Sequence, residues 1–222
     1  MKAFIVTKNM YIVTAQYLKS IGFEITTRMA EADLVQFTGG EDINPALYKE
    51  KPHRRTSFNN ARDTVELLAF EAAVKMGKRM AGICRCGQLL NVLHGGKMWQ
   101  DVDGHMAVGN HRVKDLIDDK YYSINSIHHQ MMIPDSSGLV LAEAYESLRK
   151  EGMHSDGQVK SIYYTNKSHN LGDPEAVLYW NGKIPVLCFQ AHPEFDMSGD
   201  TGKLYYKYLE MYVFESEIRK VA

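Results

Sequence analysis

MAGICRCGQLLN, Met80 to Asn91, joins an apolar run to a helix-like run through a tight turn, and the expected fold follows from it. A strand, a sharp turn that carries a nucleophile-type residue and then a helix make up a nucleophile elbow. Cys84 stands at the apex, and the positive end of the following helix points at its sulfur. A helix N-terminus and a nearby imidazolium lower the pKa of a thiol, and only the thiolate attacks. The stretch therefore predicts that Cys84 is a nucleophile at the edge of a sheet.

Strand-like and helix-like segments alternate around this elbow. The predicted strands before position 85 are 3–7, 23–27, 34–40 and 79–84, and the predicted helices near them are 11–21, 65–76 and 87–96. The helix over 65–76 has apolar residues at the spacing of one helix face, and Asp63 with Glu66 resembles a capping box at its start. Alternation of this kind favours a parallel sheet with helices on both faces.

The second half of the chain is richer in strand-like runs. The predicted strands there are YYSINSI (121–127), LVLAEAY (139–145), SIYYTN (161–166), AVLYW (176–180) and PVLCFQ (185–190). At the C-terminus, a helical stripe that indicates core packing is formed by Leu204, Tyr208, Met211 and Phe214. No internal repeat or Pro/Gly-rich linker divides the chain. We therefore expect a single α/β domain over 1–222, with a mostly parallel central sheet and helices on both faces.

Composition and charge argue against several classes of protein. The chain has 222 residues, of which 45% are apolar, and this is enough for one α/β domain with a sizeable core. Its 26 basic and 27 acidic side chains nearly cancel, so neither nucleic acid nor a membrane is expected as a partner. Three cysteines are too few, and odd in number, for a disulfide framework. The apolar run Ala3 to Val6 is too short for a signal peptide, and a cytoplasmic location is expected.

A cysteine nucleophile needs a general base and a group that orients the base. Among the nine histidines, His192 has the most suitable context, because VLCFQAHPEF (186–195) places it just past a buried strand. Glu194 follows two residues later, so in an extended backbone both side chains project to the same side. Cys84, His192 and Glu194 are therefore candidates for nucleophile, base and orienting group. The alternative is an ordinary His-Pro loop.

The reaction also needs donors for a developing oxyanion. In an elbow of this kind the N–H after the nucleophile, that of Arg85, supplies one donor. Gly39 and Gly40 end another predicted strand, so their N–H groups are candidates for the others at the same edge. By themselves, two glycines after a strand indicate only a turn.

Six blocks of the sequence, taken in order, resemble the class I glutamine amidotransferase-like family, and in particular its γ-glutamyl hydrolase (peptidase) branch. They are TGGEDINPALY (38–48), RDTVEL (62–67), GICRCGQLLNVLHGG (82–96), GGKMWQD (95–101), NSIHHQ (125–130) and EAVLYWNGKIPVLCFQAHPE (175–194). The blocks extend over most of the chain, from about 36 to 195. The resemblance implies a flavodoxin-like α/β fold and a Cys-His-Glu triad.

The resemblance also implies a reaction. Cys84 would attack the side-chain carbonyl of glutamine or of another γ-glutamyl amide, and His192 would pass a proton to the leaving nitrogen. The oxyanion would rest on N–H groups of Arg85 and of the Gly39-Gly40 loop, and water would then hydrolyse the γ-glutamyl thioester. No metal ion and no cofactor are expected.

Three more residues match positions near the substrate pocket in this branch. Gln88 matches the position that lies in the glutamyl pocket, and a helix-surface glutamine is the alternative. His128 and His129 match the His-His-Gln block near the pocket, and a structural histidine is the alternative for one of them.

The main departure from the family pattern is Cys86. The family has glycine two residues after the nucleophile, whereas here a thiol stands there and Gly87 follows. Glycine allows a helix to pack closely on a strand, so the thiol adds bulk at a tight place. It can simply fit, perturb the oxyanion loop, or form a strained Cys-x-Cys redox pair with Cys84. Zinc held by both thiols and a histidine is a further alternative, with a shorter spacer than structural zinc sites use.

Residues 145–172 form a polar insert that is longer than the usual link in the family. It is a candidate for a lid, for a surface that binds a partner, or for a hairpin with no role in chemistry.

Three functions stay open at this stage. An amidotransferase subunit would pass ammonia to a separate synthetase chain, whereas a stand-alone hydrolase would cleave a γ-glutamyl amine or peptide. A binding or regulatory module would keep the fold with little catalysis. The sequence has no phosphate-binding loop of the Gly-x-x-x-x-Gly-Lys-(Ser/Thr) type, so any acceptor chemistry is expected on another chain. The oligomeric state is also open, with a homo-oligomer as one alternative.

Overall fold

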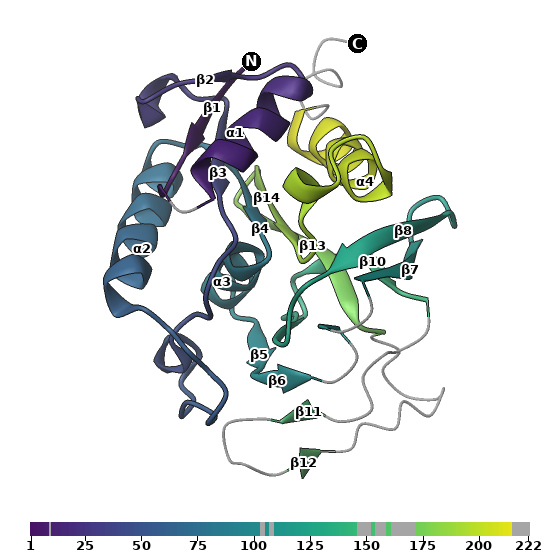
Figure 1. Ribbon diagram of the computed structural model, residues 1–222. Coiled ribbons are helices and arrows are strands. Elements are labelled where there is room, and N and C mark those ends of the chain that lie inside the picture. The colour runs from purple at the N-terminus through teal and green to yellow at the C-terminus, as the bar shows by residue number, and fades with distance from the viewer. Residues whose placement is uncertain are drawn as a thin grey trace.

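A nine-stranded sheet forms the centre of the computed structural model, which describes residues 1–8, 10–102, 105–106, 109–145, 152–153, 159–160 and 172–214. The strands lie in the order β2-β1-β3-β4-β14-β13-β10-β7-β8 (Figure 1). Their bounds are β1 Lys2–Ile5, β2 Glu24–Ile25, β3 Leu34–Phe37, β4 Arg79–Ile83, β7 Gly109–Asp115, β8 Tyr121–Ser126, β10 Leu139–Ala144, β13 Pro174–Asn181 and β14 Ile184–Phe189. The α/β class expected from the sequence is confirmed.

The sheet has a parallel half and an antiparallel half. Strands β2, β1, β3, β4 and β14 run parallel to one another. Strands β13, β10, β7 and β8 extend the sheet by antiparallel pairing. The expected parallel arrangement thus describes the half that contains the elbow. Because β3, β4 and β14 are parallel neighbours, the loops that follow Phe37, Ile83 and Phe189 leave the same edge of the sheet.

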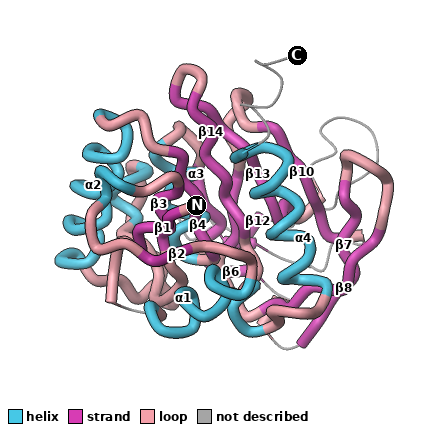
Figure 2. Tube along the Cα trace, turned by 90° about the horizontal axis from the view of Figure 1, so that it is seen from above, coloured by secondary structure: helices cyan, strands magenta, loops and turns pink. Residues whose placement is uncertain are grey.

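Each face of the sheet has its own helices and its own core (Figures 1 and 2). Helices α1 (Tyr11–Ser20) and α4 (Asp200–Tyr208), which continues as a π-helix over Leu209–Phe214, cover one face. Helices α2 (Asn60–Lys75) and α3 (Arg85–Leu93) cover the other. Strand side chains alternate between the two cores: on β4, Ala81 belongs to the first and Met80 to the second.

Helix α2 begins earlier than the sequence predicted. Its N-cap is Asn59, whose side chain accepts hydrogen bonds from the N–H groups of Ala61 and Arg62. The capping box expected at Asp63 is therefore wrong, because Asp63 lies within the first turns of the helix. Its carboxylate, like that of Glu66, is buried and turned toward the protein interior.

Part of the apolar stripe of α2 lies toward solvent. Val65 is 51% exposed, Leu68 61% and Met76 50%, whereas an apolar helical stripe ordinarily faces the core. The helix packs on the second core through Phe70 and Ala73, and the other buried residues of α2 are charged. The periodicity therefore predicted the helix correctly and did not predict which face is buried.

The remaining elements are short. Strand β5 (Lys97–Trp99) pairs with β9 (Met131–Ile133), and β6 (Asp101–Val102) pairs with β11 (Gly152–Met153), which pairs with β12 (Val159–Lys160). The 3-10 helices are Met29–Glu31, Pro45–Tyr48 and Pro193–Phe195. Most of the expected insert, and the predicted strand at 161–166, lie outside the described residues. Over the residues that are described, no helix is long and apolar enough to cross a membrane.

Candidate active site

Cys84 occupies a sharp turn between β4 and α3. Its backbone has φ 47° and ψ −114°, a left-handed conformation that L-residues other than glycine seldom adopt. The turn is held on both sides: the Cys84 N–H donates to the Phe189 carbonyl at 2.8 Å, and the Gln88 N–H donates to the Cys84 carbonyl at 3.0 Å. A strained backbone of this kind persists only where its surroundings fix it, and such residues gather at active sites.

Two glycines allow α3 to lie close against the sheet. A Cβ atom on Gly82 would be 2.4 Å from the Cys86 carbonyl oxygen, and one on Gly87 would be 2.8 Å from the Phe189 carbonyl oxygen. The tight contact that the sequence analysis assigned to position 86 is therefore made at position 87. The Cys86 side chain lies in the second core.

Cys86 is a fully buried residue of the second core. Its sulfur lies 3.6 Å from Nη1 of Arg85. Cys84, by contrast, belongs to the core on the opposite face of the sheet. Burial raises the pKa of the Cys86 thiol, with the nearby Glu66 carboxylate acting in the same direction. All three cysteines are free thiols. No potential metal-binding group within the described part of the chain includes Cys84 or Cys86, and the burial of the free Cys86 thiol in the core agrees with a simple fit.

His192 and Glu194 are hydrogen-bonded to each other. His192 Nδ1 lies 2.8 Å from Glu194 Oε1, and both residues are buried. The expectation that they share an extended backbone is wrong, because Pro193–Phe195 form a 3-10 helix. The Phe195 ring stacks on the imidazole, with the centroids 5.0 Å apart.

Asn125 fixes the backbone of His192. The Asn125 side chain donates from Nδ2 to the His192 carbonyl oxygen at 2.7 Å, and its Oδ1 accepts from the His192 N–H at 2.8 Å. The sequence analysis did not assign this residue a role. Asn125 is the first residue of NSIHHQ (125–130), and its place in this block is the sequence feature that could have indicated a role at the site.

The pKa of His192 is raised to about 10. Burial by itself lowers it, but the charge of the Cys84 sulfur and a hydrogen bond with it, together with the Glu194 carboxylate, outweigh that effect. Gly39 lies against both partners: a Cβ there would be 2.6 Å from His192 Cε1 and 3.6 Å from Cys84 Cβ. Only a glycine fits beside this thiol and imidazole.

The Gly39-Gly40 loop is held by hydrogen bonds from Arg62 of α2. Nη2 of Arg62 donates to the carbonyl oxygens of Gly39, at 2.8 Å, and Thr38, at 3.2 Å. A Cβ on Gly40, whose φ is 148°, would be 2.0 Å from Arg62 Nη1. In a trans peptide the N–H points opposite to the carbonyl. The N–H groups of Gly39 and Gly40 therefore point away from Arg62.

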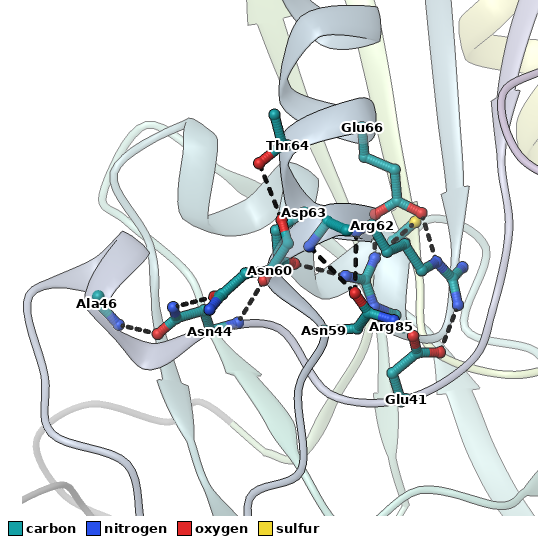
Figure 3. A network of polar contacts seen from close by, with 12 residues as sticks. Glu41, Asn44, Ala46, Asn59, Asn60, Arg62, Asp63, Thr64, Glu66 and Arg85 are labelled. Atoms are coloured by element: carbon teal, nitrogen blue, oxygen red, sulfur yellow. Dashed lines mark hydrogen bonds and ion pairs between the residues drawn. The ribbon is translucent and has the colours of Figure 1, made fainter.

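Arg85, the residue after the nucleophile, turns its side chain into a buried ion network with α2 (Figure 3). Its guanidinium bonds to Asp63 and Glu66, and Glu66 also accepts from Nε of Arg62 at 2.8 Å. Burial lowers the pKa of Arg85, but the neighbouring Cys86 and Glu66 more than offset this and raise it. The network ties the start of α3 to the helix that holds the Gly39-Gly40 loop.

Gln88 is buried behind the elbow, so a helix-surface glutamine is excluded. Its Nε2 donates to the Gln130 carbonyl oxygen at 3.1 Å and lies 3.3 Å from Oε1 of Gln190. It therefore connects the elbow with the loop after β8 and with the end of β14.

His128 and His129 point in different directions. His129 lies 3.1 Å from Asp42 Oδ1, at the loop after Gly40, and this hydrogen bond raises the pKa of the imidazole. His128 is buried, and its Nδ1 donates to the Gln130 carbonyl oxygen at 2.8 Å. Burial and the nearby His105 lower the pKa of His128 well below its usual value.

His128 also belongs to a buried cluster that the sequence analysis missed. Its other members are His105, His111, Asp173 and Glu175. The signals available were the closely spaced histidines of HMAVGNHR (105–112) and the acidic pair around Pro174. Because these segments are far apart in the chain, the pattern alone could not show that they meet.

Comparison with known proteins gives consistent matches. The model of the family Peptidase C26 matches residues 17–194. A glutamine amidotransferase-like protein of Lactococcus lactis subsp. cremoris, a YvdE homolog, is 34% identical over 126 residues, which are 48% of this chain and 67% of that one. Protein NtpR of Enterococcus hirae is 31% identical over 162 residues, 64% of each chain. The matched regions thus span about two thirds of these relatives.

Solved structures agree on the fold. The structure of PurLQS from Thermotoga maritima superimposes with a TM-score of 0.63 at 16% identity and covers 100% of this chain and 99% of that one. A glutamine amidotransferase from Thermotoga maritima gives 0.53 at 14% identity, over 100% and 86%. With the family match over most of its length, the chain belongs to the Peptidase C26 family, whose fold is that of the class I glutamine amidotransferases.

Proposed function

We propose that this protein hydrolyses the C–N bond of a γ-glutamyl amide through a thioester on Cys84. The family supports cysteine-based chemistry on γ-glutamyl amides in general. The observation that carries the proposal for these residues is the thiol–imidazole–carboxylate series at one edge of the sheet. Cys84 stands on a strained elbow, and His192 beside it is held by Glu194 at 2.8 Å.

In the first half-reaction the Cys84 thiolate attacks the γ-carbonyl carbon, and the carbonyl π electrons move to the oxygen. The N–H groups of Arg85 and the Gly39-Gly40 loop would donate hydrogen bonds to this oxyanion. As the carbonyl re-forms, the C–N bond breaks and protonated His192 gives its Nε2 proton to the leaving nitrogen. Ammonia or an amine departs, and a γ-glutamyl thioester remains.

In the second half-reaction neutral His192 takes a proton from water at Nε2, and the hydroxide oxygen attacks the thioester carbon. The C–S bond then breaks, so that glutamate leaves and the thiolate–imidazolium pair is restored. Glu194 accepts from Nδ1–H throughout, which fixes the tautomer in which Nε2 faces the reacting atoms.

A stand-alone hydrolase is the version we favour, and an amidotransferase subunit that passes ammonia to another chain is the second candidate. The Peptidase C26 match and the Gly-Gly-x-Asp and His-His-Gln blocks support the first. A substrate panel separates the two versions, because a hydrolase of γ-glutamyl amines or peptides would prefer these to glutamine.

The test is release of ammonia or amine from glutamine, γ-glutamyl amines and γ-glutamyl peptides. The native enzyme is compared with Cys84→Ala and with Cys188→Ala, a control that removes a buried thiol from β14. We expect turnover by the native enzyme and the control, and a loss of about 10³-fold or more in Cys84→Ala. Absence of Cys84-dependent turnover across the panel would leave a non-catalytic module of the same fold and overturn the proposal.

A further inference from the structure

Three imidazoles and two carboxylates are buried together beside β8, apart from the thiol–imidazole pair. Glu175 Oε1 is the common neighbour. It lies 2.8 Å from His111 Nε2, 3.7 Å from His105 Nδ1 and 4.0 Å from His128 Nε2. The exposed fraction is 0% for Glu175 and His105, 4% for His128 and 6% for His111. Groups so fully removed from water need partners inside the protein.

The proton on His128 can be placed from its contacts. Nδ1 lies 2.8 Å from the Gln130 carbonyl oxygen, which can only accept, so Nδ1 carries the hydrogen. In a neutral imidazole Nε2 then presents a lone pair. This lone pair faces Glu175, and no hydrogen-bond partner reaches it among the described residues.

The proton on His105 can be placed from its contacts in the same way. Nε2 lies 3.1 Å from Asp173 Oδ2 and donates to it, so in a neutral imidazole Nδ1 presents the lone pair. Nδ1 has the Ser126 hydroxyl at 3.5 Å, but that hydroxyl donates its hydrogen to the His105 carbonyl oxygen at 2.5 Å. A second imidazole lone pair therefore points toward Glu175, and no described residue donates to it.

The acceptors in this cluster outnumber the donors. Besides the two lone pairs, Oε2 of Glu175 has no partner within the described part of the chain, and neither has Nδ1 of His111. Among the side chains of the cluster, His111 Nε2 is the one that lies within hydrogen-bond distance of the carboxylate and can donate to it. A carboxylate and imidazole nitrogens that converge without enough protons are the donor set of a metal ion.

We propose that His105, His111, His128 and Glu175 bind one zinc ion in a closed, structural site. Ligand atoms of His105, His111 and Glu175 already lie within 4.8 Å of one another, and Nε2 of His128 lies 4.0 Å from Glu175 Oε1. The outer hydrogen bonds of two ligands also fit, since zinc-bound histidines usually donate their second N–H to a carboxylate or a backbone carbonyl. Asp173 accepts this hydrogen bond from His105, and the Gln130 carbonyl oxygen accepts it from His128.

Such an ion would join segments that are distant in the sequence. His111 lies on β7, Glu175 on β13 and His128 just after β8, and His105 precedes β7. The ion would therefore add stability to the antiparallel half of the sheet, which also supplies Asn125 to His192. The site does not include Cys84, so its occupancy can be measured separately from the proposed reaction.

The first experiment measures metal content. Purified protein is stripped with a chelator, incubated with Zn²⁺, dialysed and analysed by mass spectrometry for metals. We expect about one zinc per chain and a higher melting temperature in the zinc-loaded protein, because a ligand that binds only the folded state stabilises it. Less than stoichiometric retention would overturn the proposal.

The zinc retained by variants of the proposed ligands, compared with control variants, shows where the ion binds. Glu175→Gln and His128→Gln should each lose most of the retained zinc, whereas His53→Gln, which removes a histidine outside the cluster, should retain it. Cys84→Ser should also retain it. If Cys84→Ser loses the zinc, or if the cluster variants keep it, the ion lies elsewhere and the proposal is wrong.

Cobalt substitution gives a test that needs no variant and so does not depend on how well the variants fold. Co²⁺ in a four-coordinate site of nitrogen and oxygen ligands gives intense visible bands. We expect these bands without the near-ultraviolet charge transfer that thiolate ligands produce. Weak bands typical of six-coordinate cobalt, or a thiolate charge-transfer band, would contradict the proposed ligands.

Discussion

Asn125 controls the orientation of His192 from outside the three residues proposed for the chemistry. Its two hydrogen bonds clamp the backbone on both sides of the imidazole-bearing residue. The side chain touches no reacting atom in the proposed mechanism, so it is a positioning residue. Loss of the clamp should change the rate of the chemical step more than the binding of substrate.

Asn125→Ala is predicted to lower kcat by about tenfold to a hundredfold, with little change in KM, because two buried hydrogen bonds are worth about 1–3 kcal/mol. Steady-state kinetics on the best substrate of the panel measure both constants. Asn125→Asp keeps the acceptor for the His192 N–H and should retain more activity than Asn125→Ala. A rise in KM with unchanged kcat would argue against a positioning role.

Gly39→Ala is predicted to abolish most activity, since its Cβ would be 2.6 Å from His192 Cε1. The matched control is Gly182→Ala, in the turn between β13 and β14, where a Cβ meets nothing within 4 Å although φ is 63°. The control should lose about 1 kcal/mol of stability and keep its activity. Equal activity in the two variants would show that the contact with His192 is unimportant.

The raised pKa of His192 gives a pH prediction. Because the pKa of His192 is raised to about 10, the imidazolium persists through neutral pH and loses its proton only as the pH rises through that value. Removing the Cys84 sulfur removes the first of the two groups that raise this pKa. An NMR titration of the His192 ring should therefore give a lower pKa in Cys84→Ala than in the native protein, and an unchanged or higher value would refute the pairing.

At the scale of elements, α2 is organised around its buried charges. Arg62, Asp63 and Glu66 face inward and, with Arg85 of α3, form the network that joins the elbow to the Gly39-Gly40 loop (Figure 3). The sequence predicted this helix from its apolar spacing. It could not show that the charged face is buried, because the partner Arg85 belongs to another element. The spacing of apolar residues shows only that the helix has an apolar face and a polar face. It does not show which of the two faces is buried.

Arg85→Met is predicted to lower the free energy of unfolding by about 3–5 kcal/mol, because it leaves Asp63 and Glu66 buried without their shared cation. Denaturant unfolding measures this. Arg28→Met, in the exposed pair with Glu31, is the control and should change stability by no more than about 1 kcal/mol. Equal effects would mean that the buried network contributes no more than a surface pair.

For the molecule as a whole, the sequence predicted the parallel half of the sheet better than the antiparallel half. Strands β3, β4 and β14 were predicted as buried runs with candidate functional residues at their ends, because local apolar patterns and turns identify them. The pairing of β13, β10, β7 and β8 brings together residues that are far apart in the chain. Asn125, His111 and Glu175 could not be assigned to shared sites without that pairing.

The central claim is that Cys84 carries a γ-glutamyl thioester during turnover. Acid quenching of the enzyme with excess substrate, followed by mass spectrometry of the intact chain and of its peptides, measures this directly. We predict an added mass of one γ-glutamyl group on the peptide that contains Cys84 and localised to that residue. The adduct should disappear with hydroxylamine, which converts the thioester to a hydroxamate. An adduct on Cys86, or steady turnover with Cys84 unmodified, would contradict the proposed mechanism.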